Sequence, residues 1–148
     1  MIPEIASAEI ARIVSQVTGQ MLGITFTVSD LPPNVDSTWK CAALPINGAV
    51  PLTVSVTADA PCARQVGSRM FAIALDRVDE QMIADSLCEV VNMAAGLLKS
   101  ALRIDQPLGL PKMRASVPFA SPADAWHCHF LKAEGGLNLV LAVATRVD

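Results

Sequence analysis

The chain has 148 residues, of which 52% are hydrophobic and 17% charged, and its formal net charge is −3 at pH 7. We expect a single domain over residues 1–148, because a chain of this length buries roughly 68–70% of its unfolded surface. The acidic balance and the lack of any lysine or arginine run argue against a nucleic-acid surface.

The first residues, MIPEIASAEIARI, carry acidic side chains and no basic stretch before an apolar core, so no signal peptide is expected. The longest uncharged run, residues 41–58, contains Pro45, Asn47, Gly48 and Pro51. It is typical of a hairpin, since a membrane span needs about 20 apolar helical residues. We therefore expect a cytoplasmic protein without a membrane span.

The first half of the chain predicts one helix and three strands. Residues 3–22 have apolar side chains at steps of three and four, with Pro3 at the start and Gly23 at the stop. Residues 24–29 alternate as a half-buried strand does, and a turn-rich loop follows at 31–37. Strands at 39–46 and 51–57 are joined by Asn47-Gly48, which is a strong hairpin signal.

The second half predicts two helices and three more strands. Asp59 and Pro61 begin a helix that extends to about residue 74, and a second helix covers residues 79–102. Strands follow at 110–117, 126–133 and 137–147, with a turn at Gly135-Gly136. This order predicts an α+β domain of two layers, in which helices pack on an antiparallel sheet. Helix plus three strands, occurring twice, suggests an internal duplication.

The helix over residues 79–102 has two different faces. It lacks proline, is rich in Ala, Leu and Met, and has Asp79 as a possible N-cap. Asn is a mediocre helix former, and mid-helix Gly costs roughly 0.5–1 kcal/mol relative to Ala, so a solvated face does not explain them well. At about 100° per residue, one sector of roughly 60° holds Asp85, Glu89, Asn92 and Gly96, while the opposite side holds Leu87, Val90, Val91, Ala94, Leu98 and Ala101. We interpret the first set as a contact face and the second as the core face.

The cysteines and histidines do not form a recognisable metal site. Without a C-x-x-C pair or a secretory signal, free thiols in the core are expected for Cys41, Cys62, Cys88 and Cys128. His127 and His129 would share one face of a strand, but no nearby residue set completes four metal ligands. We interpret them as exposed or edge-strand histidines, with a metal site as the less favoured alternative.

Familiar enzyme motifs are absent from the sequence. It has no nucleotide-binding loop, no G-x-S-x-G elbow and no Cys/His pair with a known signature. A carboxylate and a carboxamide three residues apart suit another task, which is to complete the active site of a partner. An asparagine can hydrogen-bond a water and fix its line of attack without acting as a base, and geometric errors of about 1 Å can cost on the order of 10²-fold.

The spacing Asp85-x3-Glu89-x2-Asn92-x3-Gly96 resembles the signature helix of the CheC/CheX/FliY family of chemotaxis phosphatases, and most of all its CheX branch. The run EVVNMAAG stands where CheX-like proteins carry Glu-x-x-Asn-Met-x-x-Gly. LGLPKM at residues 108–113 resembles the strand that follows this helix in the family, and MLGI at residues 21–24 resembles the end of its first helix. The resemblance covers nearly the whole chain.

The resemblance implies a phosphatase for the aspartyl phosphate of a CheY-type receiver domain. Asn92 would orient the attacking water, and Glu89 would contact the active-site lysine of the receiver. Gly96 would permit close approach, and Asp85 would make a rim contact or support the helix. The Mg²⁺ would belong to the receiver, so the chain is expected to need no cofactor of its own. Relatives of this kind also tend to form homodimers through their sheet edges.

One departure from the family pattern concerns the first helix. CheC-like members carry a second Glu-x-x-Asn there, whereas here Glu9 is followed three residues later by Arg12. A single site per chain fits the CheX branch. Flagellar switch proteins share the fold without the activity, so a non-enzymatic adaptor that binds a receiver or a flagellar or signalling partner remains the alternative.

Overall fold

Helices and strands alternate in the order that the sequence predicts. The structure, a computed structural model, describes residues 5–30, 32–48, 51–115, 117 and 126–145. Its helices are α1 (Ser7–Leu22), α2 (Ala60–Phe71), a short 3-10 turn η1 (Leu75–Arg77) and α3 (Glu80–Ala101). Its strands are β1 (Thr27–Val28), β2 (Lys40–Ile46), β3 (Leu52–Ala58), β4 (Lys112–Arg114), β5 (Trp126–Ala133) and β6 (Leu137–Ala144). Among the described helices, none has both the length and the hydropathy to cross a membrane.

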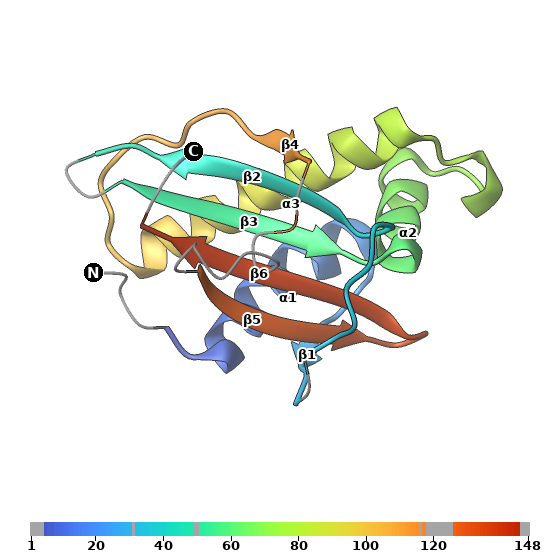
Figure 1. Cartoon of the computed structure of the whole chain (residues 1–148), viewed down its shortest axis with the longest axis horizontal. Coiled ribbons are helices and arrows are strands. Elements are labelled where there is room, and N and C mark those ends of the chain that lie inside the picture. The colour runs from blue at the N-terminus through green and yellow to red at the C-terminus, as the bar shows by residue number, and fades with distance from the viewer. Residues whose placement is uncertain (1–4, 31, 49–50, 116, 118–125, 146–148) are drawn as a thin grey trace.

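The strands form one antiparallel sheet in the order β1-β5-β6-β3-β2-β4. This order reads the same from both ends when β1, β2 and β3 are exchanged with β4, β5 and β6. The internal duplication suggested by the sequence is therefore visible as a pseudo-two-fold arrangement. The helices that precede each half, α1 and α3, lie on the same face of the sheet (Figure 1).

The core lies between the sheet and these helices. The largest side chains with under 2% exposure come from both layers: Ile10, Ile13, Val14 and Val17 of α1, Leu87 and Leu98 of α3, and Leu44, Ile46, Val54, Leu131, Leu139 and Leu141 of the strands. The helix α2 packs closely on this layer because Gly67 leaves room for Val78. A Cβ at Gly67 would lie 2.8 Å from Val78 Cγ1, which is closer than real Cβ contacts allow. This close packing fixes the beginning of α3, which follows Val78 directly.

Two predicted caps set the starts of α2 and α3. The Asp59 carboxylate accepts a hydrogen bond from the backbone N–H of Cys62 at 2.9 Å, and that of Asp79 accepts from Met82 at 2.9 Å. Each bond satisfies one of the backbone donors that the first turn of a helix leaves free. Gly23 ends α1 with φ at 69°, a left-handed conformation that suits glycine.

The strand predicted at residues 24–29 is reduced to β1, because α1 takes over its backbone groups. The Ser15 hydroxyl donates to Phe26 O at 3.0 Å and accepts from Phe26 N at 2.8 Å. The Thr18 hydroxyl donates to Ile24 O at 2.6 Å. These side chains replace the partners that a neighbouring strand would supply, so ladder pairing begins only at Thr27.

Other predicted boundaries were too long. The first helix begins at Ser7 rather than Pro3, which lies outside the described residues, and α2 ends at Phe71 because Ala72 adopts a left-handed φ of 54°. The strand predicted at 110–117 pairs only over β4, because only its residues 112–114 lie opposite β2. The last strand ends at Ala144, which is paired with Thr53 near the start of β3.

Candidate functional site

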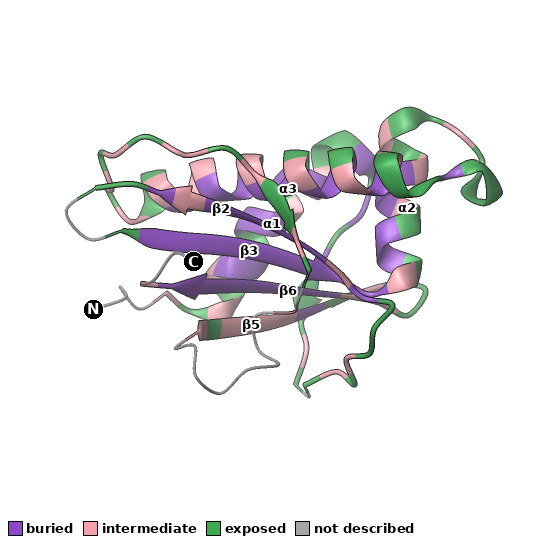
Figure 2. Cartoon of the chain, turned by 45° about the horizontal axis from the view of Figure 1, so that its top comes forward, coloured by how far each residue is buried: buried purple, intermediate pink, exposed green. Residues whose placement is uncertain are grey.

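The predicted contact face is the outward face of α3. Asp85 and Glu89 are exposed, and Asn92 and Gly96 are half-buried. From Asp85 to Gly96 the face extends roughly 16 Å, at 1.5 Å per residue. Figure 2 shows α3 with its buried residues on the side that faces the sheet and its partly or fully exposed residues on the other side. The structure thus brings all four predicted residues onto one surface.

The orientation of this face follows from the core face of the helix. α3 contacts β2 and β3 in the sheet and α1 and α2 in the helical layer. Complete burial is observed for five of the six predicted core residues, Leu87, Val90, Val91, Ala94 and Leu98. The prediction is wrong for Ala101, which is exposed because it is the last residue of the helix.

The side chains of Glu89 and Asn92 have no hydrogen bond or ion pair with any residue that the structure describes. Polar side chains on a helix surface commonly pair with a neighbour one turn away. Here the carboxylate oxygens and both ends of the carboxamide remain available. Nothing in the local network explains why an asparagine, a mediocre helix former, occupies this position.

Gly96 is not required by the packing of the chain itself. A Cβ placed there would meet no heavy atom within 4 Å, in contrast to Gly67, which Val78 approaches closely. The backbone of Gly96 is helical, so no special φ demands a glycine either. The missing side chain leaves space beside Asn92 into which an external surface can move.

Asp85 differs from the other members of the face, because it already has a partner. Gln81 Nε2 donates to Asp85 Oδ1 at 2.9 Å, one helical turn earlier. This bond supports the first half of α3 and holds the carboxylate at the end of the contact face. The sequence analysis did not single out Gln81, although its spacing of four residues from Asp85 is a recognised signal for such a pair.

Two more residues beside the face were missed, Cys88 and Met93. Burial raises the pKa of the Cys88 thiol, and the Asp85 carboxylate raises it further. The thiol therefore stays protonated at neutral pH and is a poor nucleophile. Met93 follows Asn92 directly and is 37% exposed, so it adds an adaptable apolar contact to the polar face.

The described residues offer no cluster of three or more His, Cys, Asp or Glu side chains that could hold a metal ion. The four cysteines are free; Cys41 and Cys62 are buried, whereas Cys88 and Cys128 are only half-buried. His127 is exposed on β5, and His129 is joined through Nδ1 to Ser7 Oγ at 2.8 Å. Burial lowers the pKa of His129, and neighbouring His127 contributes to the shift. This pair anchors the start of α1 to the sheet.

The fold is shared with solved chemotaxis proteins. The CheX–CheY–BeF3–Mg²⁺ complex from Borrelia burgdorferi matches with a TM-score of 0.71 and 18% identity, covering 95% of this chain and 98% of that chain. The chemotaxis protein CheX from Desulfovibrio desulfuricans matches with a TM-score of 0.66 and 21% identity, over 92% and 98% of the two chains. The FliM–SpeE complex from H. pylori reaches 0.67 with 8% identity, over 93% and 82%. These likenesses define the class by its fold.

The sequence adds the family. Residues 41–130, which include the whole of α3, match the family model described as chemotaxis phosphatase CheX. No curated protein matches the chain in sequence. The chain belongs to the CheX family of chemotaxis phosphatases.

Proposed function

We propose that the protein dephosphorylates the aspartyl phosphate of a CheY-type receiver domain, using the outward face of α3. The observation that carries the proposal is the state of this face: Glu89 and Asn92 have no partner among the described residues, and Gly96 borders open space. Membership of the CheX family supports the reaction, and the related CheX from Borrelia burgdorferi is known in a complex with CheY.

In the proposed mechanism, Asn92 enters the active site of the receiver beside the phosphoryl group. Its carboxamide hydrogen-bonds a water and holds it in line with phosphorus, as water-positioning residues do in other phosphoryl transfers. The contribution is positional, because an asparagine side chain does not take up a proton at neutral pH. A helix is a suitable carrier for this role, since its side chains are more precisely placed than those of a loop.

The remaining residues of the face hold the receiver in register. Glu89 forms a charge-assisted contact with the active-site lysine of the receiver, one turn from Asn92. Gly96 lets the receiver surface approach the α3 backbone, and Asp85, fixed by Gln81, makes a rim contact. The Mg²⁺ that neutralises the phosphoryl oxygens is bound by the receiver, so the chain contributes no metal ligand of its own.

The test is the decay of a candidate receiver's aspartyl phosphate in the presence of Mg²⁺, with wild type and Asn92→Ala compared. We expect wild type to accelerate decay and Asn92→Ala to lose about 10²-fold or more of that acceleration. Binding to a beryllofluoride-activated receiver should remain for Asn92→Ala. An Asn92→Ala protein with the full rate would overturn the mechanism. Binding without acceleration by wild type would favour the second candidate, a non-enzymatic adaptor that uses the same face.

We also propose that the protein is a cytoplasmic homodimer that pairs through a sheet edge. Both edge strands are short, and because β1 pairs only with Leu131 and Lys132, the outer edge of the first part of β5 has no paired strand among the described residues. Such unpaired strand edges are the usual sites of pairing between chains. Light scattering coupled to size-exclusion chromatography measures the mass in solution, and a monomer over a range of protein concentrations would contradict the dimer.

A further inference from the structure

A second feature of the surface lies away from the contact face of α3. An open hollow of about 590 Å³ is bordered by the end of α1 and the start of β1, by α2, and by the β5–β6 hairpin; we call it the Arg69 pocket. Small-molecule pockets have volumes of about 300–1,000 Å³, so the Arg69 pocket is large enough for an organic ligand. No residue of α3 contributes to its lining.

The floor of the Arg69 pocket is apolar. Ile24, Ala133 and Leu137 line it, and Ile24 is only 6% exposed. Ala133 and Leu137 are half-buried side chains that pack against the core and lie opposite each other in the β5–β6 pairing. The hollow is thus an opening at the end of the core, where an apolar group of a ligand would be removed from water.

One wall of the pocket carries an arginine that is already held in place. Arg69 Nη1 donates to Leu22 O at 2.9 Å. The Gln65 carboxamide, with its oxygen turned towards Arg69, accepts from Nη2 at 3.2 Å and from Nε at 3.3 Å, and this orientation gives both groups a partner. A guanidinium has five N–H donors, so donors remain for a ligand after these contacts. Because the side chain is positioned in advance, a bound anion loses less ordering entropy.

Gly23 contributes to this arrangement through its position beside the guanidinium. A Cβ at Gly23 would lie 3.2 Å from Arg69 Nη1, so a larger residue would press on the arginine. The left-handed φ of Gly23 turns the chain away at the end of α1. Arg69 lies beside this turn and donates to the carbonyl of Leu22, the last residue of the helix. The guanidinium therefore neutralises the negative end of α1 and also forms one side of the pocket.

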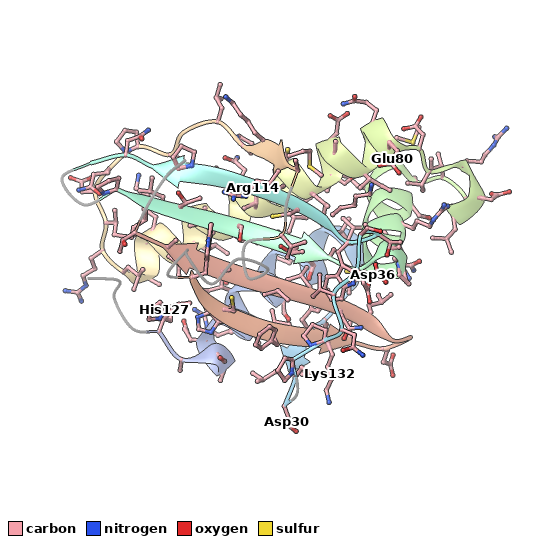
Figure 3. All side chains as sticks on the ribbon, viewed as in Figure 1. Asp30, Asp36, Glu80, Arg114, His127 and Lys132 are labelled. Atoms are coloured by element: carbon pink, nitrogen blue, oxygen red, sulfur yellow. The ribbon has the colours of Figure 1, made fainter. Side chains whose placement is uncertain are left out.

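The edge of the hollow formed by β5 and the segment around β1 supplies a second cation and two hydroxyls. Lys132 extends from β5 at the corner where β1 pairs with it, and Asp30 lies beyond the end of β1 at the same corner (Figure 3). No ion pair joins Lys132 to a carboxylate among the described residues. Thr25 and Thr27 also line the hollow, and Glu134 is the one acidic residue of the lining. The lining thus holds two cations, Arg69 and Lys132, against the carboxylate of Glu134, which favours an anionic ligand.

We propose that the Arg69 pocket binds a small organic carboxylate whose apolar body lies on Ile24, Ala133 and Leu137. The carboxylate is bound by Arg69 and Lys132, with hydroxyl donors from Thr25 and Thr27. The guanidinium donors that Leu22 and Gln65 leave free form charge-assisted hydrogen bonds with the carboxylate. The proposal does not depend on the phosphatase reaction, since the pocket and the contact face of α3 share no residue.

The test uses 1-naphthoate as the probe and the neutral 1-naphthamide as its uncharged counterpart. Both are titrated into the full-length ¹⁵N-labelled protein while backbone amide shifts are followed. We expect saturable shifts from 1-naphthoate confined to residues 23–27, 65–69 and 132–137, with much weaker effects from the amide. Lys132→Gln should weaken binding about tenfold, the loss of one charge-assisted hydrogen bond. Lys112→Gln, on β4 at the other edge of the sheet, is the matched control and should bind as wild type does.

Arg69→Gln should weaken binding at least as much as Lys132→Gln. Because Arg69 also holds the end of α1, the amide spectrum of this variant must first show a folded protein, and Lys132→Gln carries the test if it does not. Asn92→Ala should bind 1-naphthoate normally whether or not it hydrolyses a receiver phosphate. The absence of saturable shifts up to the solubility limit, shifts centred elsewhere, or equal binding by Lys132→Gln would overturn the proposal.

Discussion

α1 and α3 occupy equivalent positions in the two halves of the sheet, and each carries a polar stripe on its outward side. On α1 the side chains of this stripe hydrogen-bond to one another. Arg12 donates through Nε to Glu9 Oε2 at 3.0 Å and through Nη2 to the other carboxylate oxygen, and Nη1 reaches Gln16 Oε1 at 3.4 Å. On α3 the side chains of the acid Glu89 and the amide Asn92 have no such partners among the residues that the structure describes.

The difference shows what separates a structural stripe from a contact face. Both helices have a glutamate followed three residues later by a polar residue. On α1 this residue is Arg12, which hydrogen-bonds the Glu9 carboxylate. On α3 it is Asn92, which leaves the Glu89 carboxylate available. At the two stripe positions that follow the acid, α1 has Arg12 and Gln16 where α3 has Asn92 and Gly96. Variants on either helix can test this comparison.

Among the variants that compare the two stripes, the largest effect is expected from removing the acid of α3. Glu89→Ala should lower the rate of receiver dephosphorylation by about 10–100-fold at low receiver concentration, because a charge-assisted contact is worth about 1.5–3 kcal/mol. Glu9→Ala should leave the rate unchanged. The rate is measured over a range of receiver concentrations so that kcat and KM are separated. An equal loss in both variants would remove the functional distinction between α1 and α3.

Gly96→Ala should separate stability from activity. In the isolated protein the substitution should raise the free energy of unfolding by about 0.5–1 kcal/mol, because the added Cβ meets nothing and helix propensity improves. The same methyl group should weaken receiver docking and raise KM. Denaturant unfolding and receiver titration are the two measurements.

Gly67→Ala is the matched control for Gly96→Ala, because its Cβ would meet Val78 at 2.8 Å. This variant should lower the free energy of unfolding, since the neighbouring side chain must shift. A stabilised Gly96→Ala protein with unchanged docking would mean that the receiver does not approach the α3 backbone.

A smaller effect concerns the anchor of α1 at His129. Because its pKa is lowered in the folded state, chiefly by burial, the neutral imidazole is favoured by folding. Stability should be complete above about pH 6.5, the ordinary value, and should decline as pH falls below it, since the unfolded chain then binds a proton first. His129→Gln should flatten this part of the stability profile, measured by denaturant unfolding between pH 5 and pH 8. The start of α3 is tied to β2 by the Lys40–Glu80 ion pair at 3.1 Å, which contains no histidine, so receiver binding by its face should not change in parallel.

The smallest effect is expected within the α1 stripe itself. Hydrogen bonding to Arg12 lowers the pKa of the exposed Glu9 carboxyl below its ordinary value, so any contribution to stability is present at neutral pH and is lost as pH falls through the lowered pKa. Arg12→Ala should return the Glu9 pKa to the ordinary range in an NMR titration. It should not change the free energy of unfolding measurably, because exposed pairs contribute little. A Glu9 pKa unaffected by Arg12→Ala would mean that the pair does not form in solution.

Much of the fold could be predicted from local signals. The caps Asp59 and Asp79 and the extent of β5 agree with the sequence analysis, because capping and alternation are properties of a few neighbouring residues. The strand order could not be predicted, since alternation specifies which face is buried and not which strand lies alongside. The shortening of β1 depends on Ser15 and Thr18, whose hydroxyls look like ordinary helix residues in the sequence.

The sequence predicts which residues share the candidate face of α3, but not which of their side chains are hydrogen-bonded. The spacing of Glu89, Asn92 and Gly96 places them on one face of any helix. Whether they are paired depends on side chains that approach in space, and only the structure shows that Gln81 takes Asp85 while Glu89 remains available. The same limit applies to the Arg69 pocket, where residues from α2 and β5 meet only after the sheet has formed.

The pseudo-two-fold arrangement has a consequence for how quickly the chain folds. The two halves meet where β3 pairs with β6, and this ladder joins Thr53 to Ala144 and Ala58 to Leu139. Contacts between residues so distant in sequence require large loops to close first, which slows the folding of a mixed domain of helices and strands relative to a helical bundle. Neither half has a complete sheet without the other, so the helix that carries Asn92 gains its final support only when the last strand, β6, is in place.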